Sequence, residues 1–176
     1  MQTVDLDHTT DPQAAVEAAY AADPAHEVAL SGTYRARRPV DAVLRLGPAL
    51  SGLRLVGRGA VLDGGRVASH VVAVEDADVR IEDLVITGGD TTSPRRVGRE
   101  YRGPAGRSVY SSADGCGLLI LGDANVQVVG CDVRDNHSGM CGGGLTNQST
   151  GLVEVTASRF AGNTAFSSGA AMDNLT

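Results

Sequence analysis

"GCGLLILGDANVQVVGCDVRDN" (residues 115–136) lies over "GGGLTNQSTGLVEVTASRFAGN" (residues 142–163) when the chain is shifted along itself by 27 residues. The aligned pairs are Leu118 with Leu145, Val126 with Val153, Val128 with Val155, Val133 with Phe160, and Asn136 with Asn163. A third copy, "GAAMDN", begins at Gly169; in it Met172 follows Leu145, and Asn174 follows Asn147. A fixed period of this length is the signature of a repeat architecture.

The repeat continues toward the N-terminus after an interruption. An offset of 47 aligns the apolar positions Val79, Ile81, Leu84 and Ile86 with Val126, Val128, Cys131 and Val133. The extra residues fall within 91–112, "TTSPRRVGREYRGPAGRSVYSS", where no repeat pattern is present. Still earlier, "LRLVGRGAVL" (residues 53–62) resembles "VRIEDLVITG" (residues 79–88). The sequence therefore predicts five to six coils, the last of them only begun.

The alternation of apolar residues predicts a stack of parallel β coils. A single unit cannot bury its apolar side chains, and strands this short are stable only when both of their edges are paired. Stacking the coils at a strand spacing of about 4.8 Å satisfies both requirements. The alignment then places two columns of side chains in the interior: Leu84, Cys131 and Ser158 form one, and Ile86, Val133 and Phe160 form the other.

Glycine and asparagine recur at the ends of the aligned strands. Gly89, Asn136 and Asn163 mark one corner of each coil, where a left-handed backbone conformation suits glycine and asparagine. Stacked asparagine side chains form amide ladders between neighbouring strands. Asn147 and Asn174 point by parity toward the interior, and we expect a ladder there as well.

The two ends of the predicted stack differ. Residues 11–22 predict a helix that caps the N-terminal end, with Asp11 as its N-cap and Pro12 in its first turn. Its apolar stripe is Ala15, Val16, Ala19 and Tyr20. Residues 169–176 form an incomplete last coil with an unpaired strand edge and a poorly covered Met172. Either the coils continue in a longer solenoid, or this open C-terminal end is covered in a homodimer.

Several of these segments resemble right-handed parallel β-helix proteins of the pectate-lyase-like superfamily, which have the pectin lyase fold. "DPQAAVEAAYAADPAHEVALSGTY" (residues 11–34) is similar to their N-terminal capping helix and first strand, and "VEDADVRIEDLVITGG" (residues 74–89) and "VQVVGCDVRDN" (residues 126–136) are similar to their coil repeats. "GGGLTN…FAGNTAFSSGAA" is similar to variants in large surface β-helix proteins. The resemblance implies an all-β fold, a right-handed parallel β-helix with an N-terminal capping α-helix, as one domain over residues 1–176.

The same resemblance leaves the activity open. The superfamily includes polysaccharide lyases, hydrolases, epimerases and passive adhesins, so its fold does not decide function. The paired aspartates, Gly-His and Arg-x-Lys signatures of its polygalacturonase-like members match no stretch of this chain, and the chain has no lysine to serve as a lyase base. No catalytic residue of the family carries over.

Composition excludes several classes of partner. The net charge is -6, which gives no general attraction to nucleic acid or an anionic membrane. The N-terminal stretch has no basic leader followed by an apolar run, and no segment reaches membrane-spanning length. We therefore expect a cytoplasmic protein, or a secreted one if a signal peptide has been removed. Cys116, Cys131 and Cys141 lack the spacing of a disulfide framework or a zinc site, so we expect small core residues and no metal or cofactor.

The insertion 91–112 is the first candidate for a binding site. It holds five arginines and one glutamate in a chain that is otherwise acidic, together with Tyr101 and Tyr110. Arginine and tyrosine side chains suit carboxylates, phosphates and sugar rings. The candidate substrate-binding residues are Arg95, Arg96, Arg99, Tyr101 and Arg102. The alternative is a solvated flap that neutralises an acidic surface.

Asp90 and His137 are the candidate catalytic residues, because the offset of 47 stacks one on the other beside the insertion. A carboxylate next to an imidazole fixes its tautomer and raises its pKa, as in general acid/base catalysis. The alternative is that Asp90 caps a turn and His137 is an exposed corner residue. Asp132 lies in the same coil, but the alignment pairs it with Arg159 in a surface ion pair.

Two functions agree with these features. The first is a small β-helix enzyme that acts on an anionic small molecule or saccharide by lyase, hydrolase or epimerase chemistry. The second is a noncatalytic β-helix that binds carbohydrate, as an adhesin does, or that assembles through its surface. A change at His137 tests catalysis, whereas changes of the insertion's arginines test binding alone.

Overall fold

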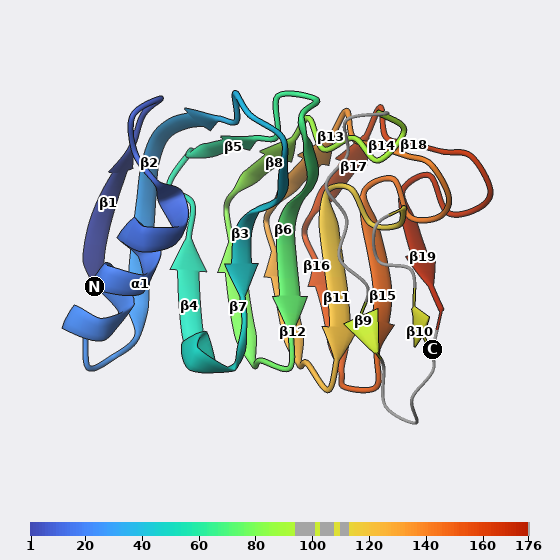
Figure 1. The fold of residues 1–176 in the computed structure, drawn as a ribbon. Helices are drawn as coiled ribbons and strands as arrows, with labels where there is room; N and C mark the ends of the chain where they lie inside the picture. The colour runs from blue at the N-terminus through green and yellow to red at the C-terminus, as the bar shows by residue number, and fades with distance from the viewer. Residues whose placement is uncertain (94–100, 103–107, 110–112, 176) are drawn as a thin grey trace.

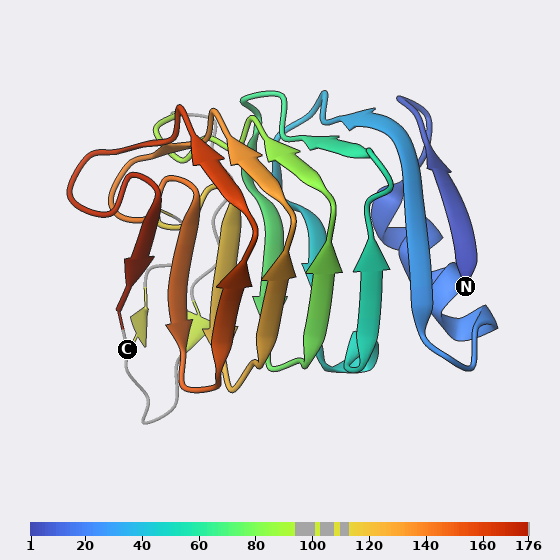
Figure 2. The same cartoon turned by 180° about the vertical axis from the view of Figure 1, so that it is seen from behind.

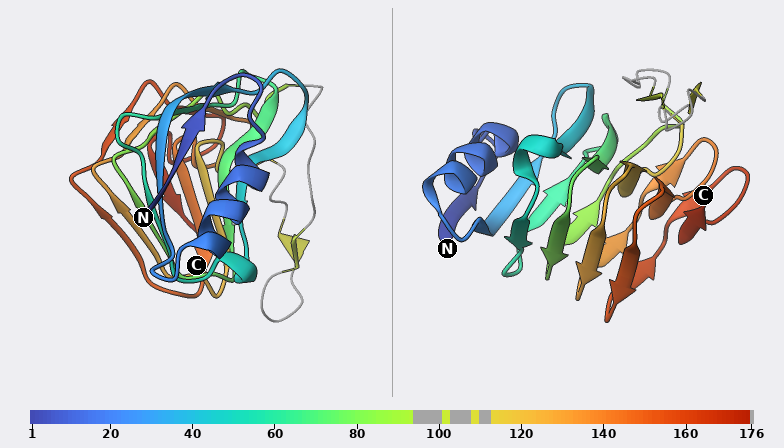
Figure 3. Two further views of the ribbon diagram at one scale, coloured as in Figure 1. Left: turned by 90° about the vertical axis from the view of Figure 1, so that its left-hand side faces the viewer. Right: turned by 90° about the horizontal axis from the view of Figure 1, so that it is seen from below.

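The computed structural model describes residues 1–93, 101–102, 108–109 and 113–175. It is a parallel β-solenoid of about six turns with one helix near the N-terminus (Figure 1). The expected all-β fold class is therefore confirmed. Figure 3 shows the coils stacked in sequence order from the N-terminal end to the C-terminal end.

Each coil contributes strands to three faces (Figure 2). The first face contains β2 (Glu27–Arg35), β4 (Leu53–Val56), β7 (Val79–Glu82), β12 (Val126–Val129) and β16 (Val153–Thr156). The long strand β2 runs on into the second face, beside β5 (Val61–Asp63), β8 (Val85–Thr87), β13 (Asp132–Arg134) and β17 (Arg159–Ala161). The third face contains β3 (Val40–Leu46), β6 (Ala68–Glu75), β11 (Leu118–Gly122), β15 (Leu145–Ser149) and β19 (Met172–Asn174).

The strand registers confirm the repeat. Leu118 pairs with Leu145, and Leu145 pairs with Met172, at the predicted offset of 27. The offset of 47 holds on the first and second faces, but on the third face it is 46, because Leu118 pairs with Val72. Leu121 pairs with Glu75, and four residues separate Leu121 from β12 whereas three separate Glu75 from β7; the extra residue is Gly122, which has a φ of 75°.

The predicted interior columns are present. Leu84 and Cys131 are buried and continue into the half-buried Ser158. Ile86 and Val133 are also fully buried, whereas Phe160 in the last complete coil is only partly covered. Apolar side chains from all three faces join them in one continuous core that extends through the stack.

The asparagine corner forms a ladder, but its backbone conformation differs from the prediction. The Asn136 Oδ1 atom accepts a hydrogen bond from the Gly89 N–H at 2.9 Å, and the Asn136 amide donates to Asn163 Oδ1 at 3.0 Å. The left-handed residues are those one position earlier: Gly88, Asp135 and Gly162, with φ of 74°, 55° and 63°. The turn is made before the asparagine, which leaves its side chain free to point inward.

The N-terminal end is covered as expected by helix α1 (Pro12–Ala22), whose N-cap Asp11 accepts hydrogen bonds from the N–H groups of Gln13 and Ala14 (Figure 3). Val16 on this helix is fully buried and belongs to the hydrophobic core. A strand that the sequence did not reveal, β1 (Gln2–Leu6), pairs in parallel with β2. A short 3-10 helix, η1 (Pro48–Leu50), follows β3.

The C-terminal end is more open. Strand β19 pairs with β15 on one side, and Met172 is 47% exposed, as predicted for an incomplete coil. Leu152 and Phe166 are also largely exposed in the last coil. Within the described residues, no helix combines the length and the apolar character that a membrane span needs.

Candidate functional site

Three residues from successive coils line one corner of the solenoid, which we call the His137 corner: Asp90, His137 and Thr164. His137 begins β14 (His137–Ser138), which pairs with β18 (Thr164–Ala165) so that His137 lies opposite Thr164. On its other side, His137 forms a parallel bridge with Asp90. The structure therefore brings together Asp90 and His137, the two candidate catalytic residues.

The two side chains have separate partners. A hydrogen bond of 2.9 Å joins the Nδ1 atom of His137 to the Thr164 hydroxyl. Asp90 Oδ1 instead accepts from the N–H and the hydroxyl of Thr92, at 2.8 and 2.5 Å. In the part of the chain that the structure describes, no hydrogen bond joins the Asp90 carboxylate to the His137 imidazole. Thr164 orients the ring, and Asp90 also caps the turn that opens the insertion.

The pKa of His137 is lower than that of a free imidazole. Burial of the ring is the largest cause, and the positive charge of Arg66 adds to it. The carboxylates of Asp90 and Asp135 act in the opposite direction but have the smaller effect. The expectation that Asp90 gives His137 a raised pKa is thus wrong in its net result, because desolvation outweighs the carboxylate. The imidazole is neutral at pH 7.

The insertion leaves and rejoins the solenoid beside this corner. The Thr91 hydroxyl donates to the Ala113 carbonyl at 2.9 Å, and the Thr91 N–H donates to the His137 carbonyl at 3.0 Å. Both ends of the segment are therefore fixed next to His137. Within it, β9 (Tyr101–Arg102) and β10 (Ser108–Val109) form an antiparallel pair.

The predicted substrate-binding residues fall on this segment. Arg95, Arg96 and Arg99 lie outside the described residues. Tyr101 and Arg102 are placed only through the backbone of β9. Substrate binding by these five residues stays a prediction. The structure describes only the two ends of the segment, at Thr91 and Ala113, and the backbone of its two short strands.

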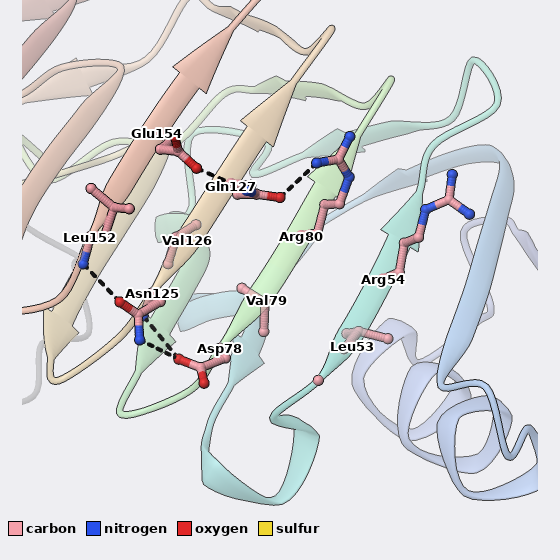
Figure 4. A pocket seen from close by; sticks show the side chains of 11 residues that line it. Leu53, Arg54, Asp78, Val79, Arg80, Asn125, Val126, Gln127, Leu152 and Glu154 are labelled. Atoms are coloured by element: carbon pink, nitrogen blue, oxygen red, sulfur yellow. Dashed lines mark hydrogen bonds between the residues drawn. The ribbon is translucent and has the colours of Figure 1, made fainter.

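Sequence reasoning missed a row of polar side chains on the outer side of the first face, above a groove of about 460 Å³ (Figure 4). Arg54 bonds to Glu27 at 2.8 Å and to Glu82 at 2.9 Å. The Arg80 guanidinium donates to Gln127 at 2.6 Å, and the Gln127 amide donates to Glu154 at 2.8 Å. The signal was in the alignment, because Arg80, Gln127 and Glu154 occupy equivalent outward positions.

The charges of this row are compensated within the row. Hydrogen bonds from Arg54 and Arg80 lower the pKa of Glu82, and hydrogen bonds to Glu82 and Glu27 raise the pKa of Arg54. Asp78 and Asn125 form a second ladder at one end of the groove, where the Asn125 amide donates to Asp78 at 2.7 Å. A ligand in the groove would compete with these contacts, so the groove is a weaker candidate than the His137 corner.

The cysteines are free thiols. Cys116 and Cys131 are buried, as expected for small core residues, whereas Cys141 is half-buried. Burial raises the pKa of Cys116 to about 11, which keeps it protonated and unreactive at neutral pH. Among the described residues, no group of three or more His, Cys, Asp and Glu side chains is placed to hold a metal ion.

Comparison with known proteins gives no relative: no family model matches the chain, and neither a curated protein nor a solved structure does. The parallel β-solenoid therefore rests on the structure itself.

Proposed function

We propose that this solenoid acts on an anionic substrate of saccharide type at the His137 corner, with His137 as the proton acceptor. The observation that carries the proposal is a neutral imidazole, held at Nδ1 by Thr164 and lying opposite Asp90. A general base must be unprotonated at the working pH, and a fixed ring directs its second nitrogen toward the substrate. The negative charge of Asp90, which acts on the ring without a hydrogen bond to it, would stabilise the imidazolium that forms during proton transfer.

The positive charges near His137 favour a negatively charged substrate. Arg66 is close enough to act on the charge of His137, and the insertion that carries five arginines is fixed beside the same residue. Guanidinium groups bind carboxylates through paired hydrogen bonds. A uronic acid or a small sugar acid would therefore present its carboxylate to the arginines and the adjacent carbon-bound proton to His137. Proton removal at that carbon is the first step of lyase and epimerase chemistry, in keeping with the proposed relation to the pectate-lyase-like superfamily.

The test is turnover of a panel of uronic-acid polymers and small sugar acids, followed by the absorbance of unsaturated products and by exchange of the α-proton with deuterium. We expect the His137→Ala variant to lose about 10²- to 10⁴-fold in rate, the usual contribution of a general base. Arg159→Ala is the matched control, since it removes an exposed ion pair with Asp132 on the adjacent face. Turnover that survives in His137→Ala would exclude His137 as the base.

A noncatalytic function is the second candidate, and the open C-terminal end favours it. Leu152, Val153, Val155 and Met172 line a depression of about 630 Å³ at this end. Its apolar walls and its unpaired strand edges suit assembly with another β surface. If no acid in the panel is turned over, and the chain self-associates through this end, the assembly function replaces the enzymatic one.

A further inference from the structure

Three arginines within four residues follow the end of β2 near the N-terminal cap, in the stretch "YRARRPV" (Tyr34–Val40). They line a pocket of about 390 Å³ whose second wall is the turn before α1; its lining residues are His8, Thr10, Tyr34, Arg35, Arg37, Arg38 and Val40. This pocket, which we call the cap pocket, is distinct from the His137 corner and does not depend on the function proposed for it.

The local backbone explains why these arginines face solvent. Ala36 is buried, and its N–H donates to the Asp63 carbonyl at 2.8 Å, which fixes the chain to the neighbouring coil. Arg35 and Arg37 flank this anchored residue and are exposed, as alternation along an extended chain requires. Pro39 then restricts the backbone before β3 begins. The arginines are thus presented on a fixed segment.

The other wall is also fixed. Asp7 Oδ1 accepts hydrogen bonds from the Thr9 hydroxyl and the Thr9 N–H, both at 2.7 Å, and from the Thr10 N–H at 2.9 Å, and these bonds lower the pKa of Asp7. Asp11 is engaged in the same way with the first turn of α1. These two carboxylates are therefore committed to their own turns, and neither forms an ion pair with an arginine of the pocket.

The charge balance of the cap pocket differs from that of the first face. Arg35 has a counterion, Asp63, at 3.4 Å. Arg37 and Arg38 form no ion pair with any residue that the structure describes, whereas Arg54 and Arg80 on the first face are each bound to a glutamate. Adjacent guanidinium groups repel one another, and an anion between them relieves that repulsion.

We propose that the cap pocket binds a phosphate or sulfate ester on a sugar-sized molecule. A planar carboxylate is satisfied by one guanidinium fork, but a tetrahedral group offers three terminal oxygens that several guanidinium groups approach from different sides. Arg37 and Arg38 would bind two of these oxygens, and the Tyr34 hydroxyl, which makes no hydrogen bond to a described residue, would donate to the third or to the sugar. The pocket volume is in the range for a small ligand.

The test is titration by calorimetry and by NMR chemical shifts with inorganic phosphate, inorganic sulfate, glucose 6-phosphate and glucuronate. We expect saturable binding of the phosphate and sulfate probes, tighter than that of glucuronate by about tenfold or more. The double variant Arg37→Gln/Arg38→Gln should weaken binding of glucose 6-phosphate by at least about tenfold, the loss expected for two charge-assisted contacts. Arg37→Lys/Arg38→Lys retains the positive charges but cannot form the paired hydrogen bonds of a guanidinium group, and it should bind glucose 6-phosphate with intermediate affinity.

Arg58→Gln is the matched control, because Arg58 is an exposed arginine on another turn, and it should bind like the parent chain. An equal loss in Arg58→Gln would show that the general field of the protein, and not the pocket, attracts the anion. Absence of saturation, or glucuronate binding as tightly as glucose 6-phosphate, would also overturn the proposal. Circular dichroism of each variant checks that the solenoid remains folded.

Discussion

Gly117 shows at the residue scale how closely consecutive coils approach. A Cβ atom built at this position would lie 2.3 Å from the Gly144 carbonyl oxygen and 2.9 Å from the Asn136 amide nitrogen. Gly144 belongs to the next turn of the stack, whereas Asn136 lies at the corner of the same turn, and neither has room to move in a packed core. The glycine is needed here for space, since its φ is not in the left-handed region.

We therefore predict that Gly117→Ala destabilises the chain by about 1–3 kcal/mol, the usual effect of overpacking. Urea unfolding followed by circular dichroism measures this change. Gly47→Ala is the matched control, because nothing lies within 4 Å of a Cβ atom at Gly47. If the two variants are equally stable, the coils separate more easily at Gly117 than the structure indicates.

A second residue-scale prediction concerns pH. Because the folded state lowers the pKa of His137, the folded chain binds this proton less readily than the unfolded chain does. The resulting stability is present above the unfolded pKa of about 6.5 and is lost as the pH falls through the folded value. His137→Gln should thus reduce the difference in unfolding free energy between pH 7.5 and pH 5. An unchanged difference in His137→Gln would show that His137 does not cause the pH dependence.

At the scale of elements, the sequence predicts most of the strands that recur from coil to coil. Aligned apolar positions located the registers of β7, β8, β11 to β13 and β15 to β17 and the bridge between Asp90 and His137, except that β11 pairs with β6 at an offset of 46. Helix α1 was predicted from its N-cap and its apolar stripe. It did not reveal β1, which has no second copy to align with. The alternative that Asp90 caps a turn agrees with its bonds to Thr92. The bond of His137 to Thr164 was not indicated, because side-chain partners depend on rotamers that no alignment contains.

The insertion is the element whose removal should leave the stability of the fold almost unchanged but reduce the proposed activity. Its ends meet at the bond between the Thr91 hydroxyl and the Ala113 carbonyl, so a short Gly-Ser link in place of residues 94–112 would close without moving the coils. We predict a melting temperature within a few degrees of the parent chain, because shortening a loop has a small effect on the entropy of closure. Turnover of an anionic substrate at the His137 corner should fall by at least about tenfold with the loss of the arginines. Unchanged turnover would remove the insertion from the proposed site.

At the scale of the whole molecule, the two ends of the solenoid differ in whether the outer edges of their strands are covered. On the third face, the Gln13 side chain on α1 donates to the Arg45 carbonyl at 3.0 Å and accepts from the Arg45 N–H at 2.8 Å, which satisfies the outer edge of β3. The Tyr20 hydroxyl similarly donates to the Ser51 carbonyl at 2.7 Å. Covering an edge in this way prevents pairing with other chains. In the described residues, β16 and β17 of the last coil have no such cover.

We predict that the chain associates as a twofold dimer through this open end, because a strand edge related to itself by a twofold axis pairs in the antiparallel direction. Light scattering after size exclusion should give twice the mass of the 18.0 kDa chain. Leu152→Glu/Met172→Glu places charges in the apolar opening and should yield monomers, since two like charges would be buried against each other. Met140→Glu changes an equally exposed methionine that does not line the opening, and it should remain dimeric. A monomeric parent chain at high concentration, or dimers that persist in the double variant, would show that the apolar opening does not hold two copies together.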